Sequence, residues 1–380
     1  MVCIKNSLTF ILLLCSISAF AQKQNATVPL ISEEGDQTLK YDLELVVPDL
    51  DIPWGMVFLP DQSILITEKD GRVIHFKEGK KTEIGGVPEV YVRGQGGLLD
   101  IELHPRYEEN GWIYLSYSSQ EGEEKGGMTA VTRVKLSDDV FTNYELLYKG
   151  SPNTRKPYHF GSRLEFDKNG YLYFSIGDRG NRDENPQDIT RDGGKIYRIN
   201  DDGSIPEDNP FYDEKNAKKA IYSFGHRNPQ GMVMHPETCE IWVHEHGPRG
   251  GDEINIVKAG ANFGWPKASY GINYSGTSFT DKKVFPGMAK SFHTWVPSIA
   301  PSGMCFITSD IYPKWKGNLL VGSLVFQYLE RLEINDSGVV KREKLMTDSG
   351  RIRNVRQGPD GYIYVAVEGK GIYKIIPSNQ

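Results

Sequence analysis

Residues 358–365, Gly-Pro-Asp-Gly-Tyr-Ile-Tyr-Val, contain a turn that is followed at once by a short strand. Pro-Asp-Gly favours a tight turn, and tyrosines alternating with β-branched residues are typical of a strand. The same combination of turn and strand occurs five more times, at residues 59–67, 104–116, 167–174, 235–243 and 313–321. Six such units in one chain predict an all-β fold, a six-bladed β-propeller.

The six units are unevenly spaced, so long inter-strand insertions separate those in the middle of the chain. In a propeller such insertions gather at the ends of the central channel, which is where a functional site is expected. Residues 41–47 alternate as a strand does. We expect this strand to complete the last blade, because that removes an exposed sheet edge.

The composition fits a large folded β domain. Among the 380 residues there are 40 glycines, and 11% of the residues are aromatic. A hydrophobic content of 38% excludes wholesale disorder. The formal net charge of −6 lacks the basic excess of a nucleic-acid-binding protein. An anionic ligand would therefore need a local cluster of cations.

The first residues differ from the rest of the chain. Lys5 precedes an apolar run from Leu8 to Cys15, and Ala19-Phe20-Ala21 resembles a signal-peptidase site. Lipid attachment at Cys15 is less favoured, because Leu14 stands where a small residue is expected. The prediction is a signal peptide at 1–21, a polar leader at 22–38 and a single β-propeller domain at 39–380, in a periplasmic or secreted protein without a membrane span.

Two cysteines, Cys239 and Cys305, remain after the predicted signal peptide. A single pair is not a disulfide framework, although an oxidising compartment would permit a bridge. We interpret both as core thiols and expect them to be unpaired.

His159 and Asp178 lie on either side of the third repeat, in residues 158–164 and 175–180. At the two ends of one hairpin they could meet as a general base and its orienting carboxylate. A histidine that caps a loop and an aspartate that makes a turn would give the same pattern. Both interpretations stay open on this evidence.

Two further strings carry clustered cations. Arg227 and Asn228 stand together in residues 224–231 and offer forked donors for a planar carboxylate or carbonyl ligand. A solvated surface turn is an equally good interpretation. Arg351 and Arg353 share one face of an extended segment, where they form either a cationic clamp or a charged, solubilising edge.

A glycine-rich loop at residues 246–255, continued by 260–266, contains Asp252 and Glu253. Carboxylates and the backbone carbonyls of such a loop are hard oxygen ligands that calcium accepts. The spacing is not that of an EF-hand. Zinc is disfavoured, because His244 and His246 have no obvious third ligand.

As a set, these strings resemble the glucose/sorbosone dehydrogenase family, the soluble aldose sugar dehydrogenases that depend on pyrroloquinoline quinone (PQQ). The resemblance runs in order through residues 53–56, 94–100, 159–164, 176–178, 225–231, 252–266, 300–303 and 351–353. It implies a six-bladed propeller, the fold that the repeats predict independently.

The resemblance implies roles at the sugar. His159 would take the proton of the anomeric hydroxyl, Asp178 would orient His159, and Gln95 would lie near both His159 and the substrate. The contacts that select the sugar would fall in the insertion between Asn273 and Trp295. Trp295 is interpreted either as a stacking platform for a sugar or as a core aromatic.

The resemblance also implies how PQQ is held. Arg227 and Asn228 would contact the quinone oxygens, Arg227 also steadying negative charge there, while Arg351 and Arg353 would pair with the carboxylates of PQQ. One position departs from the family, because Val325 stands where relatives have a lysine that contacts the cofactor. The missing charge-assisted contact would weaken PQQ binding by about tenfold to a hundredfold.

Two calcium ions are implied as well. Backbone carbonyls of Gly247 and Pro248 would hold the ion that also binds PQQ and polarises its reactive carbonyl. Glu253 and the backbone of Phe263 would hold a second, structural ion.

The sequence thus predicts a PQQ- and calcium-dependent enzyme that oxidises an aldose at C1 to the lactone and passes electrons to an external acceptor, a quinone or a cytochrome. A homodimer is compatible with this prediction. Two alternatives stay open: a calcium-dependent lactonase or other hydrolase on a propeller, which would not need Arg351 and Arg353, and a sugar- or protein-binding propeller that has lost PQQ.

Overall fold

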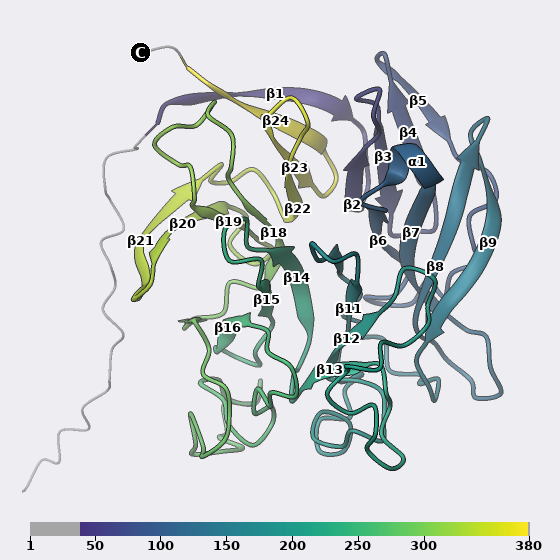
Figure 1. Ribbon diagram of the computed structural model, residues 1–380. Coiled ribbons are helices and arrows are strands. Elements are labelled where there is room, and N and C mark those ends of the chain that lie inside the picture. Colours follow the sequence, from purple (N-terminus) through teal and green to yellow (C-terminus); the bar gives the residue numbers. More distant parts are fainter. Residues whose placement is uncertain (1–38, 379–380) are drawn as a thin grey trace, which may run out of the picture.

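The computed structural model describes residues 39–378, so the predicted signal peptide at 1–21 and leader at 22–38 lie outside the described residues. Six antiparallel sheets of four strands each are arranged as blades around a common centre (Figure 1). The predicted six-bladed β-propeller is therefore confirmed. Within residues 39–378, no helix is long and apolar enough to cross a membrane.

The first three blades follow one another along the chain, each ordered from its innermost to its outermost strand. Blade 1 contains β2 (Pro53–Phe58), β3 (Ile64–Glu68), β4 (Val73–Lys77) and β5 (Lys80–Glu83). Blade 2 contains β6 (Leu98–Leu103), β7 (Trp112–Ser119), β8 (Met128–Ser137) and β9 (Val140–Lys149), with the short helix α1 (Tyr107–Asn110) before β7. Blade 3 contains β10 (Leu164–Phe166), β11 (Leu172–Ile176), β12 (Lys195–Ile199) and β13 (Ile221–Phe224).

The other three blades complete the ring. Blade 4 contains β14 (Pro229–Met234), β15 (Ile241–Glu245), β16 (Asp252–Ile256) and β17 (His293–Trp295). Blade 5 contains β18 (Pro301–Phe306), β19 (Leu319–Ser323), β20 (Leu329–Asn335) and β21 (Gly338–Leu345). Blade 6 contains β22 (Ile352–Gln357), β23 (Ile363–Val367), β24 (Gly371–Pro377) and, as its outermost strand, β1 (Tyr41–Pro48).

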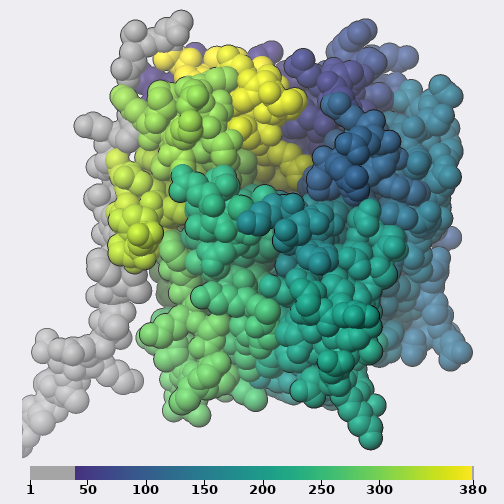
Figure 2. Space-filling model, viewed as in Figure 1, coloured from purple at the N-terminus to yellow at the C-terminus, as the bar shows by residue number. Residues whose placement is uncertain are grey.

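Strand β1 closes the ring, as its alternation predicts. It pairs antiparallel with β24, with Tyr41 opposite Pro377. The first and last described segments therefore share one sheet, and in the space-filling view their purple and yellow surfaces adjoin (Figure 2). This pairing satisfies the edge that β24 would otherwise expose.

The strand of each sequence repeat is the second strand of its blade: β3, β7, β11, β15, β19 and β23. These strands are almost wholly buried, since each is paired on both edges and covered on both faces. Their aliphatic and aromatic side chains fill the space between blades; Leu65, Leu115 and Val134, for example, pack together. Burial on both faces explains why this strand has the clearest sequence pattern.

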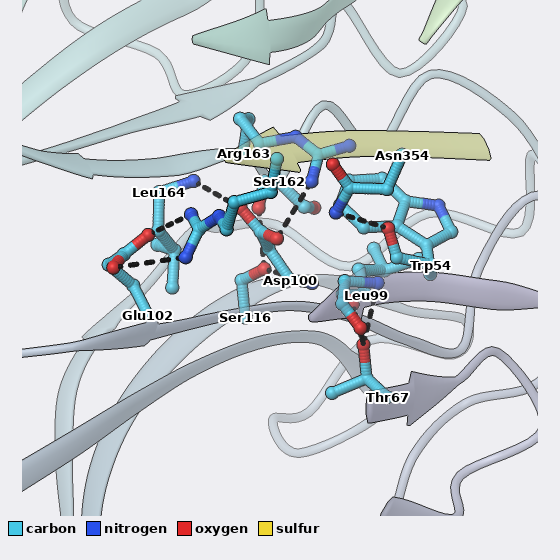
Figure 3. A network of polar contacts seen from close by, with 12 residues as sticks. Trp54, Thr67, Leu99, Asp100, Glu102, Ser116, Ser162, Arg163, Leu164 and Asn354 are labelled. Carbon is cyan, nitrogen blue, oxygen red and sulfur yellow. Dashed lines mark hydrogen bonds and ion pairs between the residues drawn. The ribbon is translucent and has the colours of Figure 1, made fainter. Parts of the chain in front are cut away.

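A polar network joins the innermost strands of four blades (Figure 3). Asp100 in blade 2 accepts hydrogen bonds from Arg163 Nη1 at 2.8 Å and from the Leu164 N–H at 2.9 Å. The Arg163 guanidinium lies over the Trp54 ring of blade 1, 4.1 Å from its centre. Asn354 of blade 6 donates to the Trp54 carbonyl at 3.2 Å. The network fixes Trp54, a wall residue of the site described below.

The structure decides between the two interpretations of Trp295 and corrects the interpretation of Cys239. Trp295 is 1% exposed, and its Nε1 donates to Glu330 at 2.7 Å, so it belongs to the core and cannot stack on a sugar. Cys239 and Cys305 are both free thiols, as predicted, but only Cys305 is buried. Cys239 lies in the turn before β15 and is half-buried, so it is not a core thiol.

Candidate active site

A cavity of about 390 Å³ lies where the innermost strands of the blades begin. Flat and aliphatic side chains form part of its wall, and amide and charged side chains form the rest. The lining includes Trp54, Leu99, Phe160, Leu324, Val325, Gln95, Gln230, Lys69, Arg351, Arg353 and Glu368. The structure therefore places the predicted Gln95, Arg351 and Arg353 around one cavity.

His159 and Asp178 meet at the side of this cavity. His159 Nδ1 lies 2.6 Å from Asp178 Oδ1. Because the carboxylate accepts this hydrogen bond, Nδ1 carries the proton and Nε2 keeps its lone pair. The backbone of His159 has a positive φ of 59°, which turns the chain sharply here, while the next two residues, Phe160 and Gly161, line the cavity.

The Asp178 carboxylate is held by two other donors. The Gly180 N–H donates to Oδ1 at 2.6 Å, and Trp265 Nε1 donates to Oδ2 at 2.8 Å. Burial tends to raise the pKa of Asp178, but the hydrogen bond and charge of His159, together with Arg227, hold this pKa below its usual value. The carboxylate stays ionised next to the imidazole.

The pKa of His159 is lowered, first by burial and then by the positive charge of Arg227, although Asp178 opposes both effects. The imidazole is therefore neutral at pH 7. A neutral imidazole with a free Nε2 lone pair is the form that can take a proton from a hydroxyl group.

Gln95 supports His159 through the backbone. Its Oε1 accepts the His159 N–H at 2.7 Å, and its own N–H donates to the Pro157 carbonyl at 2.8 Å. On the other side of this loop, Lys69 Nζ donates to the Gly94 carbonyl at 3.1 Å. Gln95 thus connects the 94–97 loop to the catalytic candidate His159 while it lines the cavity.

Arg227 and Asn228 lie next to the cavity and are absent from its lining. Arg227 Nη1 donates to the His246 carbonyl at 3.0 Å, and its guanidinium is 5.4 Å from the centre of the Trp265 ring. Asn228 Oδ1 accepts the Gly161 N–H at 3.1 Å. Both side chains brace the residues that surround the His159–Asp178 pair.

A second, much smaller cavity of about 20 Å³ adjoins the first, and His246 lines both. Its wall includes Glu245, Glu253, Gly247 and Phe263. Burial and the nearby Glu245 raise the pKa of Glu253 to about 8. Glu253 beside a space of this size is a suitable ligand for one cation. The Glu245 carboxylate is already occupied by hydrogen bonds from His226 Nδ1, Asn255 Nδ2 and the Arg227 N–H.

Asp252 does not take part in that small cavity, contrary to the sequence interpretation. Its carboxylate accepts hydrogen bonds from the Gly247 N–H at 2.7 Å, Ser298 Oγ at 2.8 Å and the Ala300 N–H at 2.8 Å. All of these contacts hold the loop that presents Gly247. The Pro248 carbonyl, a predicted ligand, accepts from Ser298 Oγ at 3.2 Å and is absent from the cavity lining.

Arg351 and Arg353 project into the cavity as a pair with a shared counter-ion. Glu368 accepts from Arg351 Nε at 2.7 Å and from Arg353 Nε at 2.9 Å. Arg351 Nη1 also donates to the Leu324 carbonyl at 3.1 Å. The glutamate thereby holds two guanidinium groups side by side, which mutual repulsion would otherwise separate.

The family model described as glucose/sorbosone dehydrogenase matches residues 50–374, nearly the whole described chain. The chain belongs to this family. An aldose sugar dehydrogenase of Escherichia coli K12 is 42% identical over 348 residues, covering 89% of this chain and 93% of that protein. The crystal structure of the soluble E. coli aldose sugar dehydrogenase in its apo form superposes with a TM-score of 0.86 at 40% identity, covering 89% of this chain and 100% of that one.

A more distant relative is the quinoprotein glucose dehydrogenase B of Acinetobacter calcoaceticus, 28% identical over 324 residues, which cover 76% of this chain and 66% of that protein. As a member of the glucose/sorbosone dehydrogenase family, the chain is an oxidoreductase that acts on a sugar CH–OH group, as the sequence predicted.

Three residues of this glucose/sorbosone dehydrogenase site escaped the sequence analysis: Trp265, Glu245 and Glu368. Trp265 lies 87 residues from the Asp178 carboxylate that it contacts. Glu245 accepts hydrogen bonds from His226 Nδ1 and from the Arg227 N–H, and lines the small cavity. Glu245 had a usable signal, its position between two histidines in a string already under consideration. Glu368 had another, because it directly follows the strand of the last repeat, which pairs with the segment that carries Arg351 and Arg353.

Val325 lines the cavity and is 54% exposed. No cationic group takes its place within blade 5 at this wall, since the other blade 5 residues there are Ala300 and Leu324. The position at which the resemblance implies a lysine therefore lies at the wall of the large cavity.

Proposed function

We propose that this protein oxidises aldose sugars at C1 to the lactone with PQQ as its cofactor, and passes the electrons to an external acceptor. The observation that carries the proposal is the neutral His159, oriented by the ionised Asp178, beside a cavity that holds three cations and flat apolar walls. That combination suits proton removal from a sugar hydroxyl next to a flat, anionic redox group.

The residues present fit PQQ, a planar tricyclic quinone with three carboxylates. Trp54 and Phe160, both almost fully buried, form part of the apolar wall, and Arg351, Arg353 and Lys69 supply positive charge in a protein whose net charge is −6. Arg351 and Arg353 would hold carboxylates, and Arg227 and Asn228 would approach the quinone oxygens. When bound, PQQ supplies an electrophilic carbonyl that can accept the hydride equivalent of the sugar C1–H bond.

The chain's own residues would handle the proton. Nε2 of His159 would take the proton of the anomeric hydroxyl, and Asp178 would stabilise the imidazolium that results. Trp265 would keep the Asp178 carboxylate in place through its 2.8 Å hydrogen bond. Gln95 would fix the position of His159 in the site, because its Oε1 accepts the His159 backbone N–H at 2.7 Å.

We also propose two calcium ions. One would be held by the backbone carbonyls of Gly247, which lines the small cavity, and of Pro248, which lines neither cavity, and would polarise the reacting carbonyl. The other would lie in the small cavity, held by Glu253 and the backbone of Phe263. The mature protein would be periplasmic or secreted, as the predicted signal peptide implies.

The test is a titration of the metal-stripped mature protein with PQQ and calcium, in which the quinone absorbance is followed before and after addition of glucose and other aldoses. Stoichiometric binding and sugar-dependent bleaching are the expected results. The variant His159→Gln should bind PQQ normally and fail to bleach it. Binding without bleaching in the wild-type protein would contradict the dehydrogenase, and no binding at micromolar PQQ would favour a sugar-binding propeller instead.

A further inference from the structure

Three cations line the large cavity, and they differ in their partners. Arg351 and Arg353 share the Glu368 carboxylate. Lys69 has no carboxylate partner among the described residues; its Nζ donates one hydrogen bond, at 3.1 Å, to the Gly94 carbonyl. An ammonium group has three donors, so Lys69 keeps two for another acceptor.

The order of the blades places Lys69 next to the two arginines. Lys69 directly follows β3 in blade 1, whereas Arg351 and Arg353 stand at the beginning of β22 in blade 6. Strand β22 contacts β2 of blade 1 on one side and β18 of blade 5 on the other. Lys69 and Val325 therefore belong to the two blades that flank the arginine pair.

The net charge of the side chains that line the large cavity depends on Lys69. Three cations against one carboxylate, Glu368, leave its lining with two net positive charges. Glu368 cancels one of the two arginine charges. Removal of the Lys69 charge would therefore halve the net positive charge of the cavity lining.

We propose that Lys69 holds a carboxylate of the anionic cofactor and supplies, from blade 1, the lysine contact that Val325 removes from blade 5. The inference rests on the proposed function and adds a cofactor-binding residue to it. Lys69 binds the carboxylate through both its charge and its free donors. It holds that carboxylate on the side of the cavity next to Gln95.

A purely structural role makes a different prediction. If Lys69 served only to hold the Gly94 carbonyl and hence the Gln95 loop, a neutral donor of similar length would replace it. Lys69→Gln keeps a donor for Gly94 and removes the charge, whereas Lys69→Met removes both. Lys69→Arg keeps both.

The experiment measures the PQQ dissociation constant at saturating calcium, from quenching of tryptophan fluorescence and from the quinone absorbance, without sugar. We expect Lys69→Gln and Lys69→Met to weaken PQQ binding by about tenfold or more, and Lys69→Arg to stay within about threefold of wild type. The second substitution Val325→Lys should restore much of the affinity of Lys69→Gln. Binding to Lys69→Gln should also depend less on salt than binding to wild type.

Lys81→Gln is the matched control. Lys81 belongs to the same blade and also donates to backbone carbonyls, Pro48 at 2.9 Å and Asp49 at 3.3 Å, but it does not line the cavity. This variant makes the same change in net charge and should bind PQQ as wild type does. Equal loss in the control would mean that overall charge matters and would overturn the inference.

Two further outcomes are distinguishable. If wild type binds PQQ and Lys69→Gln binds it equally well, Lys69 is not a cofactor contact, and the proposed function stands. If wild type itself does not bind PQQ, the proposed function and this inference both fail.

Discussion

Asp178→Asn tests the proton-handling pair most directly. Asp178 Oδ1 accepts from His159 and from the Gly180 N–H, whereas Oδ2 accepts only from Trp265. An asparagine has one acceptor oxygen. That oxygen is better placed at the Oδ1 position, where it accepts from both His159 and the Gly180 N–H. Its NH2 group would then face Trp265 Nε1–H, donor against donor.

The size of each effect follows from these contacts. Leaving the indole N–H of Trp265 without an acceptor in a buried place should lower the free energy of unfolding by about 1–3 kcal/mol. Loss of the carboxylate charge removes the group that stabilises the His159 imidazolium, so kcat should fall by about 10²–10⁴. Binding of PQQ should change little, because Asp178 does not line the cavity.

The assay combines single-turnover bleaching of bound quinone with a pH profile. His159 has a lowered pKa, so wild type should keep its activity somewhat below the ordinary histidine value of about 6.5. Asp178 raises that pKa, so its replacement should move the acid limb of the profile to still lower pH. Sugar oxidation within tenfold of wild type, with an unmoved acid limb, would refute the proposed pair.

Asp192→Asn is a matched control for this experiment. Asp192 is also buried, and accepts hydrogen bonds from Tyr148 at 2.6 Å, Tyr197 at 3.0 Å and the Ser151 N–H at 2.9 Å, but lines neither cavity. It should lose at least as much stability without the fall in kcat, because it also gives up an ion pair with Lys218 Nζ at 3.0 Å. The comparison separates loss of the acid–base pair from general loosening of the protein.

Three other substitutions or conditions have defined outcomes. Because the pKa of Glu253 is raised to about 8, the metal-free protein should lose stability as the pH rises through that value. For the same reason, calcium affinity measured by calorimetry should fall about tenfold for each pH unit from pH 8 down to pH 6. Glu253→Gln should abolish both trends, and persistence of either trend would exclude Glu253 as its source. Val325→Lys should tighten PQQ binding by about tenfold in the absorbance titration, and unchanged affinity would mean that this wall does not reach the cofactor. Leu115→Ala in the core between blades should cost about 2–5 kcal/mol in urea unfolding without a change in kcat, and a cost under 1 kcal/mol would contradict the packing described.

The sequence anticipated those parts of the site that lie close together along the chain. His159 and Asp178 stand at the two ends of the β10–β11 hairpin, so strand pairing alone brings them together. Arg351 and Arg353 alternate on an extended segment and therefore share a face. In each case a local geometric rule was enough.

Contacts between distant segments could not be read from the sequence. Trp265 comes from the long insertion between β16 and β17, yet it reaches Asp178 of blade 3. Asp252 looked like a calcium ligand, but its oxygens are occupied by backbone N–H groups and Ser298. Trp295 looked like a possible platform, but blade packing buries it.

The sequence by itself determined the fold of this protein and the site elements that lie near each other in the chain, because repeated turns and alternating strands act over a few residues. Only the tertiary structure decided which charges in the cavity are already paired. Glu368 neutralises part of the arginine clamp, whereas Lys69 remains without a carboxylate partner among residues 39–378. The pairing of Glu368 with the arginines forms within blade 6, where β22 pairs with β23. Lys69 comes from blade 1 and reaches the same cavity only when blades 6 and 1 close the ring, and no local sequence pattern records that placement.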